Sequence, residues 1–141
     1  MPRKLSSERA SSISVLLVSG DLQLTRRLTT AFAKAAPRFV VNRAVNRSQI
    51  ESLAVPALML LDLRLTGEPA TELLRWFRAD SRYRHIPVIA LGSEGMELDM
   101  EKAYAAGANS CLLKTVPLSS VVRGMAKYAN LATASAAGAA N

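Results

Sequence analysis

Short apolar runs alternate along the chain with apolar stripes at helical spacing. Continuous runs bounded by turn residues predict buried strands, and they lie at 13–18, 39–43, 58–65, 88–91 and 110–113. The run 58–65 reads Leu-Met-Leu-Leu-Asp-Leu-Arg-Leu and has one carboxylate, Asp62, toward its far end. Continuous runs of this kind are typical of strands covered on both faces of a parallel sheet. The pattern therefore predicts a sheet organised around 58–65.

Apolar residues between these runs recur with the period of a helix. Asp21 can cap the first helix, and Ser48 can cap a short helix over 49–53. The expected inner faces are Leu24, Leu28, Ala31, Phe32 and Ala35; Ala70, Leu73, Leu74 and Phe77; Met96, Met100, Ala103 and Tyr104; and Leu118, Val121, Val122, Met125 and Leu131. Gly107 is placed to end the helix that carries the two methionines.

Strand and helix alternate five times between 13 and 131. With right-handed crossovers, this alternation predicts a flavodoxin-like, doubly wound α/β fold, in which helices cover both faces of a five-stranded parallel sheet. Residues 1–12 are polar and aperiodic, which predicts a disordered lead, and 132–141 are rich in Ala and Gly, which predicts a tail or linker. We therefore expect one domain over 13–131.

The composition indicates in which cellular compartment this domain is found. The sequence has 141 residues, and no apolar run approaches the roughly 18–20 residues of a membrane span. Its one cysteine, Cys111, cannot form an internal disulfide, which fits a reducing compartment. We therefore expect a cytoplasmic protein that does not insert into a membrane.

The formal net charge of +7 raises the question of an anionic partner. Many basic residues fall in the lead or on expected helix surfaces, and a further group comprises Arg75, Arg78, Arg82 and Arg84. No zinc motif or aromatic-basic signature accompanies them, so a solvated face is the preferred interpretation and a nucleic-acid partner is disfavoured. A basic domain that docks on nucleic acid or an anionic surface remains a third hypothesis, marked by salt-sensitive binding.

Asp62 is the first candidate for chemistry. Ligands of open α/β sheets collect just outside the carboxyl ends of the strands, and Asp62 lies where the central run ends. An acid that only caps a loop is the alternative. The chain has no Gly-rich phosphate loop and no nucleophile-base pair, and its single histidine, His85, lies in an expected loop. An independent enzyme is therefore disfavoured.

Several stretches together resemble the receiver domains of bacterial two-component systems. They are Val15-Leu16-Leu17-Val18, the Leu-Leu-Asp-Leu run around Asp62, Arg-His-Ile-Pro-Val-Ile at 84–89, and Ala106-Gly107-Ala108-Asn109-Ser110 leading to Lys114. The resemblance implies that Asp62 accepts a phosphoryl group from a kinase histidine and that Lys114 pairs with that group. It also implies that the backbone carbonyl of Arg64 helps to hold a divalent cation.

The metal site departs from the family pattern. Family members carry two adjacent acids after the first strand, which hold Mg²⁺ together with the accepting aspartate, whereas Ser19 and Gly20 occupy these positions here. Because Mg²⁺ needs hard oxygen ligands, Asp62 should bind it weakly. Asp21 is a candidate extra ligand, although a helix cap explains it more simply. The Arg64 guanidinium could fold back toward Asp62 in place of the metal, or it could be solvated.

The positions that switch receivers between states also differ from the family pattern. Gly92, followed by Ser93, stands where the family has a Ser or Thr that binds the phosphoryl group. Cys111 stands where the family has a movable aromatic, and Thr115 replaces the proline that follows Lys114. Since a cis bond before Thr115 would cost about 3–4 kcal/mol, we expect a reshaped loop there.

These departures favour an atypical receiver domain that acts mainly by binding a protein partner, with weak or absent Mg²⁺-dependent phosphorylation of Asp62. The partner would be a histidine kinase or a downstream effector, docked near the fourth and fifth strands and the last helix, and a homodimer is a further option. No cofactor is expected, and Mg²⁺ would be needed only for phosphorylation. The alternative is a working phosphorelay receiver, phosphorylated on Asp62 by a histidine kinase.

Overall fold

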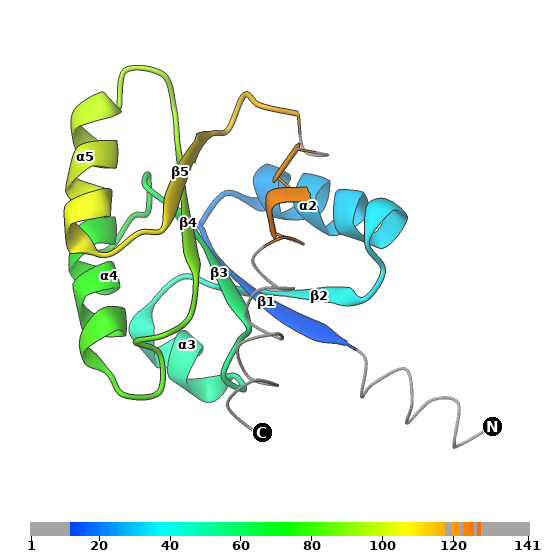
Figure 1. Ribbon diagram of the computed structural model, residues 1–141, viewed down its shortest axis with the longest axis horizontal. Helices are drawn as coiled ribbons and strands as arrows, with labels where there is room; N and C mark the ends of the chain where they lie inside the picture. Colours follow the sequence, from blue (N-terminus) through cyan, green and yellow to red (C-terminus); the bar gives the residue numbers. More distant parts are fainter. Residues whose placement is uncertain (1–11, 118–119, 122, 126, 128–141) are drawn as a thin grey trace.

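The computed structural model describes residues 12–117, 120–121, 123–125 and 127. Five strands within this part of the chain form one parallel sheet in the order β2-β1-β3-β4-β5 (Figure 1). The strands are β1 Ile13–Val18, β2 Phe39–Ala44, β3 Leu58–Asp62, β4 Val88–Gly92 and β5 Ser110–Leu113, and the helices are α2 Leu22–Ala35, α3 Arg47–Ser52, α4 Ala70–Ala79 and α5 Glu97–Ala106. The strand order and direction confirm the predicted flavodoxin-like fold.

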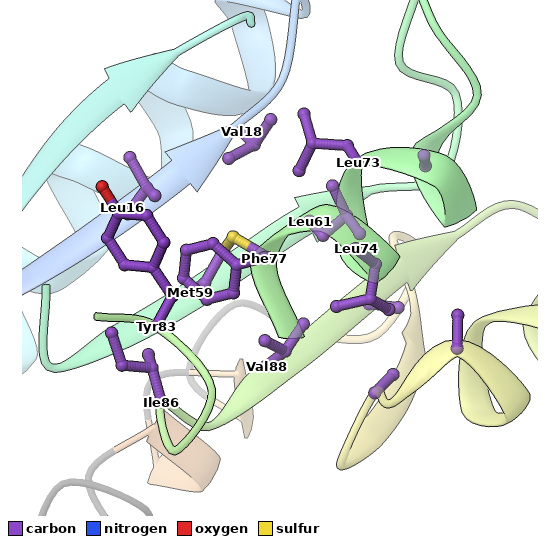
Figure 2. Close-up of a cluster of buried hydrophobic side chains, with 14 of the residues drawn as sticks. Leu16, Val18, Met59, Leu61, Leu73, Leu74, Phe77, Tyr83, Ile86 and Val88 are labelled. Carbon is purple, nitrogen blue, oxygen red and sulfur yellow. The ribbon is translucent and has the colours of Figure 1, made fainter. Parts of the chain in front are cut away.

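Buried side chains form one hydrophobic cluster on each face of the sheet. One cluster joins the strands to α3, α4 and α5, and it includes Phe77 stacked on Tyr83 with ring centroids 4.6 Å apart (Figure 2). The other cluster joins the opposite face to α2 and to Val121 and Met125, both predicted as buried positions of the last helix. Strand residues alternate between the two clusters, and the buried polar side chains of the described residues, Ser19 and Asp62, lie at strand ends.

The central strand ends at Asp62, where the sequence predicted that the buried strand would end. The apolar run continues to Leu65 outside the strand, because the Leu65 N–H donates to the Asp62 carbonyl oxygen at 3.1 Å and closes a turn. Leu63 and Leu65 still pack against the first cluster, which accounts for their apolar character. Asp62 is therefore the last residue of β3, at the edge where the carboxyl ends of the strands meet.

The start of α3 was predicted wrongly. Its cap is Asn46 and not Ser48, since Asn46 Oδ1 accepts a hydrogen bond from the Gln49 N–H at 2.9 Å. In return, Gln49 Oε1 accepts a hydrogen bond from the Val45 N–H at 2.8 Å. This reciprocal arrangement resembles a capping box and leaves Ser48 inside the helix.

The helix α5 confirms one prediction and corrects another. Gly107 ends it in the left-handed conformation, with φ 115°, as the sequence predicted. Its buried residues, however, are Ala103 and Ala106, whereas Tyr104 is 52% exposed and Met100 is only partly buried. Two small residues can bring a helix close to its neighbours, so α5 packs here without a wide apolar stripe.

The charge pattern predicted that Arg78 would lie on a solvated face, and for this residue the prediction was wrong. Its guanidinium donates to the carbonyl oxygens of Gly107 at 3.0 Å and Ile86 at 2.6 Å. It also donates to the Arg84 carbonyl at 3.1 Å and to Asn109 Oδ1 at 2.8 Å. Burial lowers the pKa of Arg78. The side chain therefore ties α4 to the segment before β4 and to the turn after α5.

Some expected features lie outside the described residues. They are the lead up to residue 11, the tail 132–141, and the helix positions Leu118, Val122 and Leu131. Across the part of the chain that is described, none of the helices has both the length and the apolar character needed to cross a membrane.

Candidate functional site

The carboxylate of Asp62 is buried at the end of β3, and both of its oxygens have partners. Oδ1 is 2.7 Å from Lys114 Nζ and accepts a hydrogen bond from the Arg64 backbone N–H at 2.9 Å. Oδ2 accepts a hydrogen bond from the Ser19 hydroxyl at 2.7 Å. Asp62 is 2% exposed, so an unpaired charge here would be costly. The ammonium and two hydrogen bonds compensate it.

The sheet brings these groups together from distant parts of the sequence. Val18 pairs with Leu61 in the β1–β3 register, so Ser19 and Asp62 emerge side by side. Lys114 follows β5, and its backbone N–H donates to the Gly92 carbonyl at 2.8 Å. The flexible four-carbon stem of lysine then spans β4 to reach β3. The parallel order of the strands thus creates the site.

Ser19 takes a role that the sequence did not reveal. It is fully buried, and its hydroxyl accepts a hydrogen bond from the Asp21 N–H at 3.0 Å while donating to Asp62. Arg43 Nε donates to the Ser19 carbonyl oxygen at 2.9 Å and fixes the backbone. The hydroxyl donates its one proton to Asp62 and accepts from the Asp21 N–H, so Ser19 is held in one orientation toward Asp62.

Asp21 caps a helix and does not contact Asp62. Its Oδ1 accepts a hydrogen bond from the Leu24 N–H at 3.0 Å, which confirms it as the N-cap of α2. Gly20, between the two, is exposed and has open space, since a Cβ there would meet only Thr66 Oγ1 at 3.8 Å. The segment therefore supplies a hydroxyl to Asp62 and directs its one carboxylate to the helix.

Arg64 contributes its backbone and not its guanidinium. Its N–H binds the Asp62 side chain two residues earlier, as in an Asx-turn. The side chain is exposed and makes no hydrogen bond or ion pair with any described residue. The hypothesis of an Arg64 clamp on Asp62 is therefore wrong, because the turn that satisfies Oδ1 directs the side chain outward. Lys114 is the cation at the site.

The switch positions form a small apolar and sulfur-containing cluster beside the site. Gly92 is buried at the end of β4, and the Ser93 N–H donates to Met96 Sδ at 3.3 Å. The Cys111 N–H donates to the Tyr104 hydroxyl at 3.1 Å. Burial raises the pKa of the Cys111 thiol above its usual value, and the hydrogen bond with Tyr104 acts in the opposite direction. None of these side chains binds Asp62.

The donors around Asp62 do not suit a divalent cation. Among the described residues, no group of three or more His, Cys, Asp or Glu side chains is placed to hold a metal. An ammonium lies on one oxygen of Asp62 and a hydroxyl proton on the other. Mg²⁺ takes oxygen ligands in near-octahedral geometry, and these two donors would have to move before it could bind Asp62.

Comparison with known proteins agrees with this fold. No protein-family model matches the sequence. The Polar-differentiation response regulator DivK of Brucella abortus (strain 2308) is 29% identical over 120 residues, which is 82% of this chain and 94% of that protein. Response regulator Rre1 of Synechocystis sp. is 30% identical over 108 residues, which is 74% of this chain and 46% of that protein.

A solved structure extends the comparison to three dimensions. The receiver domain of the sensor histidine kinase PA1611 from Pseudomonas aeruginosa PAO1, with magnesium coordinated in its active-site cleft, has a TM-score of 0.74 and 21% identity. The match covers 84% of this chain and 98% of that one, and at this identity it shows the fold alone. The chain is therefore similar in sequence to response regulators and similar in fold to receiver domains.

Proposed function

We propose that this chain is an atypical receiver domain that acts mainly through protein-protein interaction, with weak or absent Mg²⁺-dependent phosphorylation of Asp62. One observation carries the proposal: the Ser19 hydroxyl and the Lys114 ammonium, each 2.7 Å from Asp62, satisfy both oxygens of the carboxylate. The resemblance to receivers implies an acid at position 19 that would hold a metal, and here a hydroxyl stabilises the carboxylate directly.

The chemistry of phosphoryl transfer explains why this matters. The transferred group carries negative charge, and most of its catalysis comes from positioning and from cations that neutralise that charge. A carboxylate nucleophile must also present a free lone pair to phosphorus. With Lys114 and the Arg64 N–H on Oδ1 and the Ser19 hydroxyl on Oδ2, Asp62 keeps only one lone-pair site for attack, on Oδ2 beside Ser19.

The proposed docking surface lies beside β4 and β5 and includes α5. Leu98 and Tyr104 on α5 are 63% and 52% exposed. The helix and the loop before it also carry several exposed acidic residues, namely Glu94, Glu97, Asp99 and Glu101. Exposed apolar side chains on an acidic helix suit a protein partner, either a histidine kinase or a downstream effector.

The test is the intact mass of the purified protein after incubation with a small-molecule phosphodonor, with and without Mg²⁺. We expect no gain of a phosphoryl group by the wild type, and none by Asp62→Asn. The double variant Ser19→Asp, Gly20→Asp restores the acidic pair, and it should gain one phosphoryl group only with Mg²⁺. A stoichiometric, Mg²⁺-dependent gain by the wild type that Asp62→Asn abolishes would refute the proposal.

That refuting result would establish the second candidate, a working phosphorelay receiver. The observation in its favour is that Asp62 and Lys114 are in direct contact, in the roles that the resemblance implies. Because Lys114 would help Mg²⁺ to neutralise the incoming phosphoryl group, Lys114→Met should then reduce the gain, whereas Asp62→Asn removes the nucleophile and abolishes it.

A further inference from the structure

Met100 fills the space in which a side chain at position 92 would lie. A Cβ built on Gly92 would be 2.6 Å from Met100 Cε and 3.6 Å from Met100 Cγ, with Leu63 Cδ1 at 3.5 Å. Carbon atoms do not approach to 2.6 Å, so any side chain at position 92 would displace the end of Met100. Gly92 and Met100 are therefore a matched pair, one on β4 and the other on α5.

Met100 is the middle of three contacts that join α5 to the ends of β4 and β5. Met96 Sδ accepts a hydrogen bond from the Ser93 N–H at 3.3 Å, one turn before it. The Met100 carbonyl lies 3.7 Å from Cys111 Sγ. One turn after Met100, the Tyr104 hydroxyl binds the Cys111 N–H at 3.1 Å. Residues spaced by four share one side of a helix, so this side of α5 is held along its length.

We propose that Met100 is a positioning residue that holds α5 in one arrangement against β4 and β5, whatever the state of Asp62. The inference deepens the proposed function, on which it rests, because it makes the α5 docking surface preformed. Gly92 has no side chain that could move in response to a change at Asp62, and Met100 occupies the space where such a side chain would lie. The backbone of Gly92 is connected to the site by the hydrogen bond that the Lys114 N–H donates to the Gly92 carbonyl oxygen.

The physical reason is that a conformational change needs a second arrangement of comparable stability. Packed interiors do not deform continuously, so a helix whose contact side is filled has one favoured position. Removing the Met100 side chain would leave a void above Gly92 and would give α5 room to move. The helix should then become mobile relative to β5.

Cys111 is the only cysteine in the chain and therefore reports on this movement. Its thiol is partly buried beside Met100, so its rate of reaction with a thiol reagent under native conditions should rise when α5 opens from β5. We expect Met100→Ala to raise this rate about tenfold, because the free energy of local opening enters the rate exponentially. The matched control is Leu98→Ala, which shortens a 63% exposed side chain on the same helix and should leave the rate within twofold.

Two further variants test the inference in case Met100→Ala does not fold. Met100→Leu keeps the volume of the side chain and should label like the wild type. Gly92→Ala keeps Met100 and displaces only its terminal methyl, so it should raise the labelling rate less than Met100→Ala does. The inference is overturned if Met100→Ala labels at the wild-type rate, or if Leu98→Ala raises the rate equally.

The link to Asp62 has its own readout. With Met100 present, Asp62→Asn should leave the labelling rate of Cys111 within twofold, because α5 does not respond to the site. A tenfold change in that variant would refute the inference even if Asp62 takes up no phosphoryl group. Conversely, Mg²⁺-dependent phosphorylation of the wild type would refute the proposed function. An unchanged labelling rate of Cys111 in Asp62→Asn would still support the role of Met100.

Discussion

Replacing Lys114 by methionine should destabilise the protein more than replacing Asp62 by asparagine. The two side chains form one ion pair, but the Asp62 side chain is 3% exposed and the Lys114 side chain is 17% exposed. Lysine has a long stem that can carry its ammonium into water once its partner is gone, whereas the carboxylate of Asp62 cannot leave its buried position. Loss of Lys114 should therefore cost more stability than loss of the Asp62 charge.

The magnitude follows from what each variant leaves behind. Breaking a buried pair by removing one partner costs about 3–5 kcal/mol when the remaining charge has no compensation. After Lys114→Met, Asp62 keeps the hydrogen bonds from Ser19 and Arg64, so we expect a loss of about 2–4 kcal/mol. After Asp62→Asn, the ammonium turns toward water and the amide can still accept the Arg64 N–H, so the loss should be about 1 kcal/mol.

The assay is urea unfolding of both single variants and the double variant, followed by the fluorescence of the only tryptophan, Trp76. In the Asp62→Asn background, Lys114→Met should cost less than about 1 kcal/mol, giving a coupling energy of about 1–3 kcal/mol. The melting temperature of Lys114→Met should fall by roughly 7–14 °C, and that of Asp62→Asn by roughly 3–4 °C. Equal losses for the two single variants, or additive losses in the double variant, would refute this account of the site.

Other contacts lead to three further predictions. Ser19→Ala removes a donor to Asp62 and should cost about 1–3 kcal/mol in the same unfolding assay, while Ser19→Thr, which keeps the hydroxyl, should cost less. Arg78→Met should cost about 2–3 kcal/mol, and Arg78→Lys should recover less than half of it, because an ammonium cannot reach every acceptor at once. The hydrogen bonds from Arg82 lower the pKa of Asp80 to about 2 in the folded protein, so their contribution to stability is present above the ordinary pKa of 3.8 and is lost as the pH falls toward 2. Asp80→Asn should therefore make stability less dependent on pH in that window, and an unchanged acid transition would contradict this.

The periodicity of the sequence predicted the strands and their common edge. Continuous apolar runs place Asp62 and Lys114 after buried strands, and parallel strands bring their carboxyl ends to one side of the sheet. Since this inference depends only on chain direction and burial, it needed no knowledge of side-chain conformation. The same reasoning recognised Asp21 and Gly107 as helix ends, because their backbone roles follow from residue type.

Side-chain partners could not be predicted in the same way. The direction of Arg64 depends on a turn in which its own N–H binds Asp62, and nothing in the residue types distinguishes this from a guanidinium clamp. Ser19 was predicted to lie in the pocket in place of an acid, but its hydrogen bond to Asp62 was not predicted, since the orientation of a hydroxyl is set by its neighbours. The pairing of Gly92 with Met100 joins two elements whose relative position is decided by packing.

The hydrogen bond between Tyr104 and Cys111 also bears on association between copies of this chain. β5 is the last strand on its side of the sheet, and an outer strand offers unpaired N–H groups to any other extended chain. The Tyr104 hydroxyl, delivered by α5, already accepts the Cys111 N–H at 3.1 Å. A second strand would have to displace this tyrosine before it could add to the sheet there. The helix thus protects the margin of the sheet against edge-to-edge aggregation.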